Sequence, residues 1–421
     1  MLRHTAITVA TTLAFALATP LAAQSPEEVA EAALDAAPVW DGHNDVPIQL
    51  RSRVGNEIGD FDFEHTDHTQ TDTRNAMHTD LARLKAGKVG AQWWSVYVSA
   101  SLDEPEAVQM TIEQIDVTKR LIARYPDEMT LALSADDVEA AMAEGRIAGL
   151  LGMEGGHSIG SSLAVLRQMY DLGARYMTLT HGRNTPWADS ATDAPAHGGL
   201  TDFGKDLIRE MNRIGMVVDL SHVSEATMND ALDVARAPVI FSHSSARAIN
   251  GHARNVPDAV LRRLVENRGI IMVTAVPGFL SEEARVWNAN RDAEQARLEA
   301  LWQGQPEAVA AGMAAWDDAN PYPPADIGDM ADHIDHVRNI AGIDAIGIGG
   351  DYDGIPFAPE GLEDVSTYPA LFTELARRGY SQDDLEKISS RNMMRVMREV
   401  EATKAAMADV PPYEYSTNEE R

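Results

Sequence analysis

The sequence contains no cysteine among its 421 residues. This absence excludes disulfide bonds, thiolate nucleophiles, cysteine-ligated metals and a lipidated N-terminal cysteine. A metal site in this chain can therefore use only nitrogen and oxygen ligands, and such a set suits zinc, with manganese, cobalt or iron as other fitting ions.

Basic residues are scarce in the chain. Lys and Arg together number 35 against 65 Asp and Glu, which gives a formal net charge of −30 at pH 7. A surface of this sign repels phosphate backbones and anionic lipid headgroups, so neither nucleic acid nor an acidic membrane surface is expected as a partner. The acidity itself indicates a highly soluble protein, as would suit a salty habitat.

Long hydrophobic runs are missing after the N-terminus. Residues 1–23 have a basic start, a short apolar run and a small-residue end, which predicts a secretory signal peptide cleaved after Ala23. The competing interpretation is a membrane anchor, but threonines interrupt the apolar part and it is shorter than the roughly 20 residues that a span needs. No apolar tail for a glycolipid anchor follows at the other end. Export without disulfides indicates a bacterial periplasm, with no stable membrane anchor.

Eight apolar runs recur along the chain, and each closes in a polar or glycine-containing corner. They are APVWDGHND, VGAQWWSVYVS, IAGLLGMEGGH, ARYMTLTH, GMVVDLSH, APVIFSH, RGIIMVTA and DAIGIGGDYDG. Runs without polar alternation are typical of parallel strands buried on both faces, and helical patterns lie between most of them. The sequence therefore predicts an α/β fold, a single (β/α)₈ TIM-like barrel over residues 24–421.

Four stretches complicate this pattern. Residues 128–134 could add a further strand, and residues 409–421 are expected to form a loose tail. Residues 52–78 are polar and dotted with histidines, while residues 281–325 form an insertion rich in Ala, Trp and Pro. Both are predicted to be excursions at the mouth of the barrel, and the second is expected to be partly helical.

The ends of the predicted strands carry an unusual set of side chains. In barrels of this kind, the catalytic groups collect at the C-terminal ends of the strands. Here these ends supply His43, Asp45, Glu154, His222, His243 and Asp351, together with His181. A single histidine after a strand is most often a hydrogen-bonding residue, but independent turns have no reason to converge on ligand types. Three imidazoles and three carboxylates predict a site for two divalent cations, because one carboxylate can bridge two metals.

The other histidines are expected outside the set of ligands. Three of them lie in the polar stretch and are predicted to be solvated: His65, His68 and His78. His333 and His336 are three positions apart on a predicted helix without a third ligand, so structural hydrogen bonding is expected. His157 follows Glu154 closely and is predicted to support the ligands from behind.

The motifs around these residues strongly resemble those of the membrane (renal-type) dipeptidase family of zinc peptidases, the M19 class. The matching stretches are DGHNDVP, GAQWWSVYV, GMEGGHSI, LTHGRNTPWAD, DLSHVSEATM, PVIFSHSSARA, RNVPD and IGIGGDYDG, which follow the family order from about residue 38 to 396. The resemblance implies a zinc-dependent dipeptidase that hydrolyses dipeptides with a free C-terminal carboxylate through a metal-bridging hydroxide. It also implies a homodimer, which the composition does not require.

The resemblance further implies how the ligands divide between two zinc ions. One zinc would be held by His43, Asp45, Glu154 and Asp351. The other would be held by Glu154, His222 and His243.

Two more residues are implied to act on the substrate. His181 matches the histidine that contacts the scissile carbonyl, and Arg254 matches the arginine that holds the substrate carboxylate. Asp351 would accept the proton of the water and pass it to the departing amine. Spacing alone does not separate Asp351 from Asp353, and only the family pattern selects the first. For Arg254, the competing interpretation is a surface ion pair in an acid-rich protein.

The residues alone leave two other functions open. The first is another two-metal amidohydrolase on the same barrel, acting on lactones, cyclic amides or phosphotriesters. Many of those enzymes bridge their metals with a carboxylated lysine at a strand end, whereas this sequence offers Glu154 and no strand-end lysine. The second is an exported metal- or peptide-binding protein without turnover, which would need neither His181 nor an open metal position.

Overall fold

Eight parallel strands close into a barrel in the computed structural model, which describes residues 24–66 and 77–415. The strands are β1 (Val39–Asn44), β2 (Val89–Ser95), β4 (Ile147–Glu154), β5 (Ala174–Thr178), β6 (Val217–Asp219), β7 (Ile240–Phe241), β8 (Ile270–Val273) and β9 (Ile346–Ile348). Each of these strands pairs in parallel with the next one named, and β9 pairs with β1 to close the ring. The predicted TIM barrel is therefore confirmed, with one strand from each of the eight apolar runs.

The additional strand near residues 128–134 is also present. It is β3 (Met129–Leu131), which pairs with the first part of β4 and stands outside the closed ring. Every residue of β1, β2 and β4 is buried, as the absence of polar alternation in their sequences predicts.

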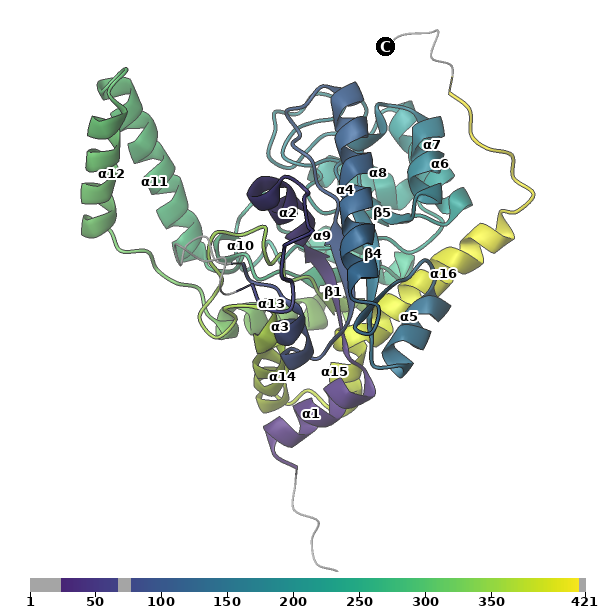
Figure 1. The fold of residues 1–421 in the computed structure, drawn as a ribbon. Coiled ribbons are helices and arrows are strands. Elements are labelled where there is room, and N and C mark those ends of the chain that lie inside the picture. The colour runs from purple at the N-terminus through teal and green to yellow at the C-terminus, as the bar shows by residue number, and fades with distance from the viewer. Residues whose placement is uncertain (1–23, 67–76, 416–421) are drawn as a thin grey trace, which may run out of the picture.

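Helices surround the barrel (Figure 1). Along the chain they are α1 (Pro26–Ala36), α2 (Val46–Val54), α3 (Leu81–Ala86), α4 (Glu104–Arg124), α5 (Ala135–Ala143), α6 (Leu163–Asp171), α7 (Asp202–Ile214), α8 (Glu225–Val234), α9 (Asp258–Asn267), α10 (Pro277–Leu280), α11 (Glu282–Leu301), α12 (Pro306–Ala319), α13 (Ile327–Ala341), α14 (Tyr368–Arg377), α15 (Gln382–Glu386) and α16 (Asn392–Ala406). Helix α7 illustrates why they form, since Thr201 accepts a hydrogen bond from the Gly204 N–H at its start and Gly215 ends it at φ 82°.

Helix α16 covers the N-terminal end of the barrel. Its apolar residues Met393, Val396 and Met397 belong to the same buried cluster as Trp40 and Trp93 on the strands. The Asn392 side chain donates to the carbonyl of Ile346, where β9 begins. At the opposite end of the barrel, where the strands finish, connecting loops surround the opening.

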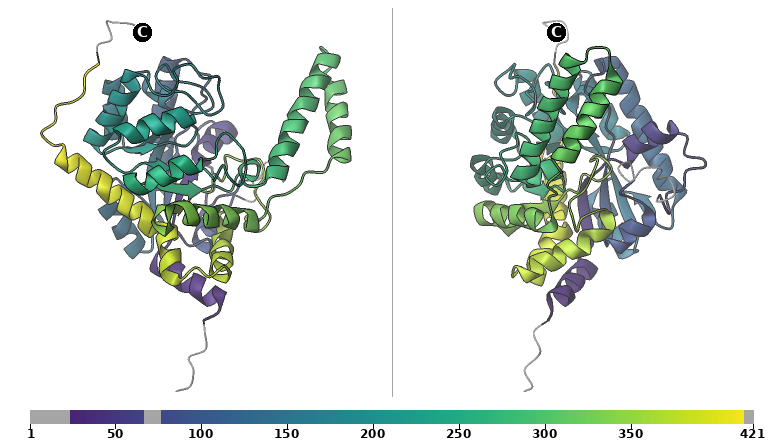
Figure 2. Two further views of the ribbon diagram at one scale, coloured as in Figure 1. Left: turned by 180° about the vertical axis from the view of Figure 1, so that it is seen from behind. Right: turned by 90° about the vertical axis from the view of Figure 1, so that its left-hand side faces the viewer.

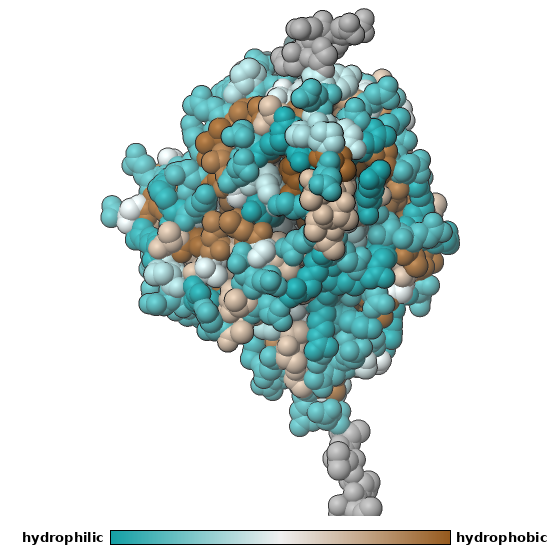
Figure 3. Space-filling model, turned by 90° about the vertical axis from the view of Figure 1, so that its right-hand side faces the viewer, coloured by the Kyte–Doolittle hydropathy of each residue, from teal (hydrophilic) through white to brown (hydrophobic). Residues whose placement is uncertain are grey.

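The insertion over residues 281–325 forms a helical hairpin. Helices α11 and α12 pack against each other and stand away from the barrel (Figures 1 and 2). The face turned toward the viewer in Figure 3 is mostly hydrophilic, and hydrophobic side chains show there in separate patches. Across residues 24–66 and 77–415, no helix combines the length and the apolar character needed to cross a bilayer.

Part of the polar stretch over residues 52–78 differs from expectation. His65 is exposed as predicted, whereas His78 is half-buried and bonded to Asp353, so the prediction that His78 is solvated is wrong. Phe61 and Phe63 of this stretch are buried in the main core. The predicted signal peptide and His68 lie outside the described residues, as does the tail beyond residue 415.

Candidate metal centre

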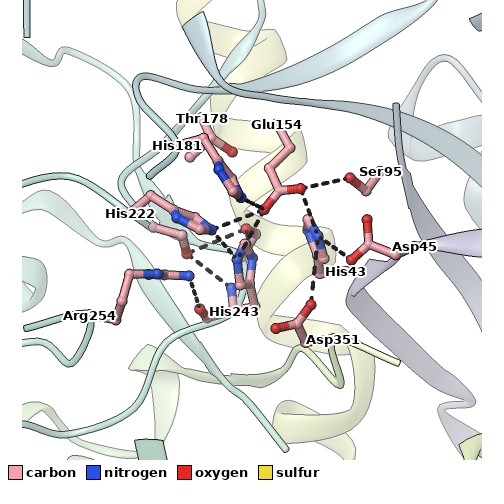
Figure 4. Close-up of polar contacts among 12 residues, drawn as sticks. His43, Asp45, Ser95, Glu154, Thr178, His181, His222, His243, Arg254 and Asp351 are labelled. Carbon is pink, nitrogen blue, oxygen red and sulfur yellow. Dashed lines mark hydrogen bonds and ion pairs between the residues drawn. The ribbon is translucent and has the colours of Figure 1, made fainter. Parts of the chain in front are cut away.

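All seven strand-end residues meet at the C-terminal end of the barrel (Figure 4). They line one cavity of about 320 Å³ together with Arg254 and Tyr97, except for His43, which lies beneath it. We call this space the metal cavity. The convergence follows from the parallel strands, since the carboxyl ends of such strands meet at one end of a barrel.

His43 is the centre of one half of the cluster. It lies near the end of β1, and its Nε2 is 3.3 Å from Oδ2 of Asp45 and 3.5 Å from Oε2 of Glu154. Oδ1 of Asp351, which follows β9, is 4.0 Å away. Asp45 occupies the position before α2 without capping that helix, so its carboxylate is free to face the cavity.

The second half of the cluster gathers around the other oxygen of Glu154. Oε1 of Glu154 lies 3.0 Å from Nε2 of His222, 3.4 Å from Nε2 of His243 and 3.6 Å from Nε2 of His181. Oε2 accepts a hydrogen bond from the Ser95 hydroxyl at 3.0 Å. The two oxygens of this one carboxylate therefore face two different sets of side chains.

A tyrosine beneath the cluster orients His43. The hydroxyl oxygen of Tyr176 on β5 lies 2.9 Å from Nδ1 of His43, on the side of the ring opposite the carboxylates. The Tyr176 ring passes over Gly152 of β4, where a Cβ atom would lie 2.0 Å from the ring. Glycine at position 152 is thus required for the tyrosine to reach His43.

Two site residues adopt a backbone conformation that is uncommon for residues other than glycine. His222 has φ 68° and Asp351 has φ 61°, both in the left-handed region. Such conformations concentrate at functional sites, where the surrounding structure holds them. Asp351 is held by its N–H, which donates to the carbonyl of His43 at 3.1 Å.

The protonation of the cluster follows from burial and crowding. Burial lowers the pKa of His222 and His243 well below the usual range, and the nearby Arg254 adds to this effect. Burial would raise the pKa of Glu154, but His43 and His181 outweigh it and hold that pKa well below its usual value. Burial and neighbouring carboxylates raise the pKa of Asp351.

These residues fit divalent cations. Nε2 of His43 is fully buried and has no hydrogen-bond partner, although it faces three carboxylate-bearing residues. Neutral imidazoles at His222 and His243 expose a lone pair, which metal binding requires. Gly354 borders the cluster closely enough that a Cβ atom there would lie 2.1 Å from Oδ2 of Asp45. Buried carboxylates crowded in this way call for positive charge between them.

Arg254 projects into the metal cavity (Figure 4). Its guanidinium donates to the Ser244 hydroxyl and to the carbonyl of His243, both at 3.3 Å. Only 3% of the residue is exposed, and no ion pair of Arg254 with a carboxylate occurs in residues 24–66 and 77–415. The interpretation of Arg254 as a surface ion pair is therefore wrong.

The structure separates the two aspartates that spacing could not. Asp351 faces His43, whereas Oδ1 of Asp353 accepts a hydrogen bond from the His78 N–H at 2.9 Å. The Asp353 N–H in turn donates to Nδ1 of His78. Asp353 therefore ties the loop after β9 to the polar stretch near residue 78.

Three histidines outside the cluster, His157, His333 and His336, have structural partners. His333 accepts the Ala246 N–H at 3.0 Å, and His336 pairs with Asp258 at 2.8 Å, so the predicted structural hydrogen bonding is confirmed. His157 contacts the carbonyl of Val98 behind the cavity.

Sequence reasoning missed five residues that support the cluster from behind: Asp41, Ser95, Tyr176, Asp219 and Ser242. Oδ1 of Asp41 accepts the N–H groups of His43 and Gly350, which fixes β1 against the loop after β9. Asp219 accepts the Ser242 hydroxyl. A signal was present, because each aspartate lies in a buried strand two or three residues before a histidine, in VWDGH and VVDLSH.

Comparison with known proteins agrees with this geometry. The family model of the membrane dipeptidases, peptidase family M19, matches residues 27–410. The chain is 42% identical over 381 residues to dipeptidase tcpJ of Claviceps purpurea, with 88% of this chain and 79% of that protein covered.

Solved structures show the same fold. The probable dipeptidase PvdM from Pseudomonas aeruginosa superposes with a TM-score of 0.76 at 23% identity, covering 90% of this chain and 99% of that one. A metallopeptidase from Rhodobacter sphaeroides, liganded with a phosphinate mimic of the dipeptide L-Ala-D-Ala, gives a TM-score of 0.70 at 22% identity, covering 86% and 99%. The family match extends over nearly the whole chain and includes every strand-end residue of the cluster. The chain therefore belongs to the membrane dipeptidase family, peptidase family M19, and is a metal-dependent hydrolase of the dipeptidase type.

Proposed function

We propose that this protein hydrolyses the peptide bond of dipeptides with a free C-terminal carboxylate, using two divalent cations, zinc foremost. The observation that carries the proposal is the placement of Glu154. Its two carboxylate oxygens face two separate sets of ligand-type side chains, and Arg254 lies in the same cavity.

The proposed ligands divide as the two oxygens of Glu154 do. One cation would be held by His43, Asp45, Glu154 and Asp351. The other would be held by Glu154, His222 and His243. When bound, such cations polarise a carbonyl group and lower the pKa of water toward neutrality.

Arg254 supplies recognition of the substrate. Burial lowers its pKa to about 10, so the guanidinium stays charged at neutral pH. A guanidinium can form two parallel hydrogen bonds with one carboxylate, and burial strengthens that pair. The metal cavity holds about 320 Å³, which is at the small end of ligand sites. The fixed distance between Arg254 and the cluster then restricts the substrate to very short peptides.

Two further side chains would assist the reaction. Burial lowers the pKa of His181, so its ring is neutral and can donate an N–H to the carbonyl oxygen as negative charge develops there. Asp351 faces the cluster through Oδ1, where it can accept a proton from water and pass it to the departing amine. His181 remains about a quarter exposed, consistent with a group that meets substrate.

The relatives support dipeptides as the substrate class. The Claviceps purpurea relative is named a dipeptidase, and the Rhodobacter sphaeroides structure carries a dipeptide mimic. For the location of the enzyme we propose export to a bacterial periplasm, on the composition of residues 1–23. N-terminal sequencing of the exported protein tests this, with a first residue of Gln24 as the expected result.

A substrate panel with metal analysis tests the proposal. Purified protein is assayed on free, N-blocked and C-amidated dipeptides, and elemental analysis gives the metal content per chain. We expect two ions per chain, hydrolysis of free dipeptides, and its loss on complete chelation and return on adding zinc. Hydrolysis that survives metal removal would exclude the mechanism. Turnover of lactones or phosphotriesters in place of dipeptides would identify another two-metal amidohydrolase.

A further inference from the structure

A second, larger cavity adjoins the metal cavity. It holds about 790 Å³ between the first turns of α11, the segment after β8 and the loop after β9. Its walls carry the rings of Phe279, Trp287, Tyr322 and Phe357. We call it the aromatic cavity. Its volume lies in the upper part of the range for small-molecule sites, whereas the metal cavity lies near the bottom.

The two cavities adjoin each other. Phe279 lines both of them, and the backbone passes from Gly354 in the metal cavity to Ile355 in the aromatic cavity. The guanidinium carbon of Arg254 lies 5.3 Å from the centre of the Phe279 ring. Phe279 therefore separates the proposed anchor for the substrate carboxylate from the aromatic cavity.

Three aromatic side chains in the walls of the aromatic cavity contact one another in series. The Trp287 and Tyr322 ring centres lie 4.9 Å apart, and those of Tyr322 and Phe357 lie 5.4 Å apart. Pairs of aromatic rings at such distances attract each other beyond the effect of buried area. A further ring that packs against their exposed sides would gain similar contacts.

The two arginines that line this cavity are already paired. Arg291 bonds Asp317 at 2.8 Å, and Arg285 pairs with Glu282. Burial and nearby arginines lower the pKa of His252 to about 4, so it is neutral at physiological pH. With both arginines neutralised, the cavity offers no positive counter-charge for an acidic side chain, and apart from the exposed carboxylate of Asp292 its surface is mainly apolar and aromatic.

We propose that the aromatic cavity binds the side chain of the C-terminal residue of the dipeptide and selects large, uncharged, above all aromatic, side chains there. The inference rests on the proposed function. In a dipeptide bound by Arg254, the carboxylate and the side chain branch from the same Cα atom. That side chain consequently starts beside Phe279, the residue that lines both cavities.

Three matched dipeptides and three variants test the inference. The substrates are Gly-Gly, Gly-Trp and Trp-Gly, and the quantity compared is the kcat/KM of Gly-Trp divided by that of Gly-Gly. Tyr322→Ala removes a wall of the cavity, and Ala289→Trp places a ring inside it from an exposed position of α11. Trp302→Ala is the control, since Trp302 lies in the same insertion but does not line the cavity.

We expect the native enzyme to favour Gly-Trp over Gly-Gly, and both cavity variants to reduce that ratio by roughly five- to tenfold through a higher KM. The kcat/KM for Gly-Gly should be the same in both cavity variants as in the native enzyme. Trp302→Ala should keep the native ratio of Gly-Trp to Gly-Gly. A ratio near one in the native enzyme, or a ratio unaffected by both cavity variants, would overturn the inference while leaving the dipeptidase function intact. A preference for Trp-Gly that these variants reduce would assign the cavity to the first residue and equally overturn it. Failure to hydrolyse any dipeptide would instead overturn the proposed function.

Discussion

The hydroxyl oxygen of Ser242 lies 2.8 Å from Nδ1 of His243, its neighbour in the chain. The same hydroxyl lies 2.7 Å from Oδ2 of Asp219, which as a carboxylate can only accept a hydrogen bond. Ser242 must therefore donate to Asp219 and accept from His243, so the proton of the imidazole is on Nδ1. Nε2 of His243 then carries a lone pair toward Glu154 and the proposed cation.

Replacing Ser242 by Ala is expected to weaken metal binding, because the His243 ring loses the contact that fixes its tautomer. Loss of such supporting contacts typically lowers metal affinity by about 10- to 100-fold. Competition against a chromophoric chelator measures the change. Ser245→Ala is the matched control, since Ser245 is equally buried but its hydroxyl has no hydrogen-bond partner. Equal affinity in Ser242→Ala and the native protein would exclude this role.

His181→Ala is expected to retain the metal and lose turnover. His181 is proposed to contact the substrate carbonyl rather than a cation, and removal of one such donor costs about 10²- to 10³-fold in kcat. Elemental analysis and dipeptide assays on the same sample check both parts. Loss of one ion per chain would show instead that His181 is a ligand, as its distance of 3.6 Å from Glu154 also permits.

The effects of Arg254 and of the substrate carboxylate on kcat/KM are expected to depend on each other. For the native enzyme, C-amidation of the dipeptide should reduce kcat/KM by roughly 10- to 100-fold, the value of a charge-assisted hydrogen bond. In Arg254→Met, free and amidated dipeptides should be hydrolysed at similar low rates. Kinetics on all four combinations give the coupling. If amidation has the same effect in both proteins, Arg254 does not bind the carboxylate.

Glu210 makes stability depend on pH. It is fully buried and pairs with Arg167 at 2.8 Å and Arg213 at 2.7 Å. Burial would raise its pKa, but these arginines outweigh burial and lower the pKa below the usual 4.5. A lowered carboxyl pKa stabilises the fold above pH 4.5, and this contribution disappears as the pH falls through the folded-state value.

We therefore expect Glu210→Gln to lower the free energy of unfolding by about 1 to 3 kcal/mol at pH 7, with the difference shrinking below pH 4.5. Denaturant titrations at several pH values measure it. Asp206→Asn, which breaks the partly exposed pair with Arg209 on the same helix, should change stability by less than about 1 kcal/mol. A constant difference at every pH would refute this account.

The sequence predicted the barrel and the members of the cluster for one physical reason. Buried parallel strands show as continuous apolar runs, and their carboxyl ends must meet at one end of the barrel. Residues as distant as His43 and Asp351 could therefore be placed together without any contact being known.

The supporting contacts could not be predicted in the same way. The position of Tyr176 beneath His43 depends on Gly152 leaving room on a neighbouring strand, which no local pattern reveals. His78 was expected in solvent because its partner Asp353 is 275 residues away. The aromatic cavity arises only where the insertion meets two loops, so the composition of residues 281–325 gave no indication of it.

The hairpin of α11 and α12 adjoins the barrel only at its base. The two helices pack mainly against each other, and α11 also packs against α10. The length and composition of the hairpin can change without displacing a strand or any hydrolytic group. The substrate preference of this enzyme can thus change through replacement of the α11–α12 hairpin, while the barrel and its catalytic residues stay the same.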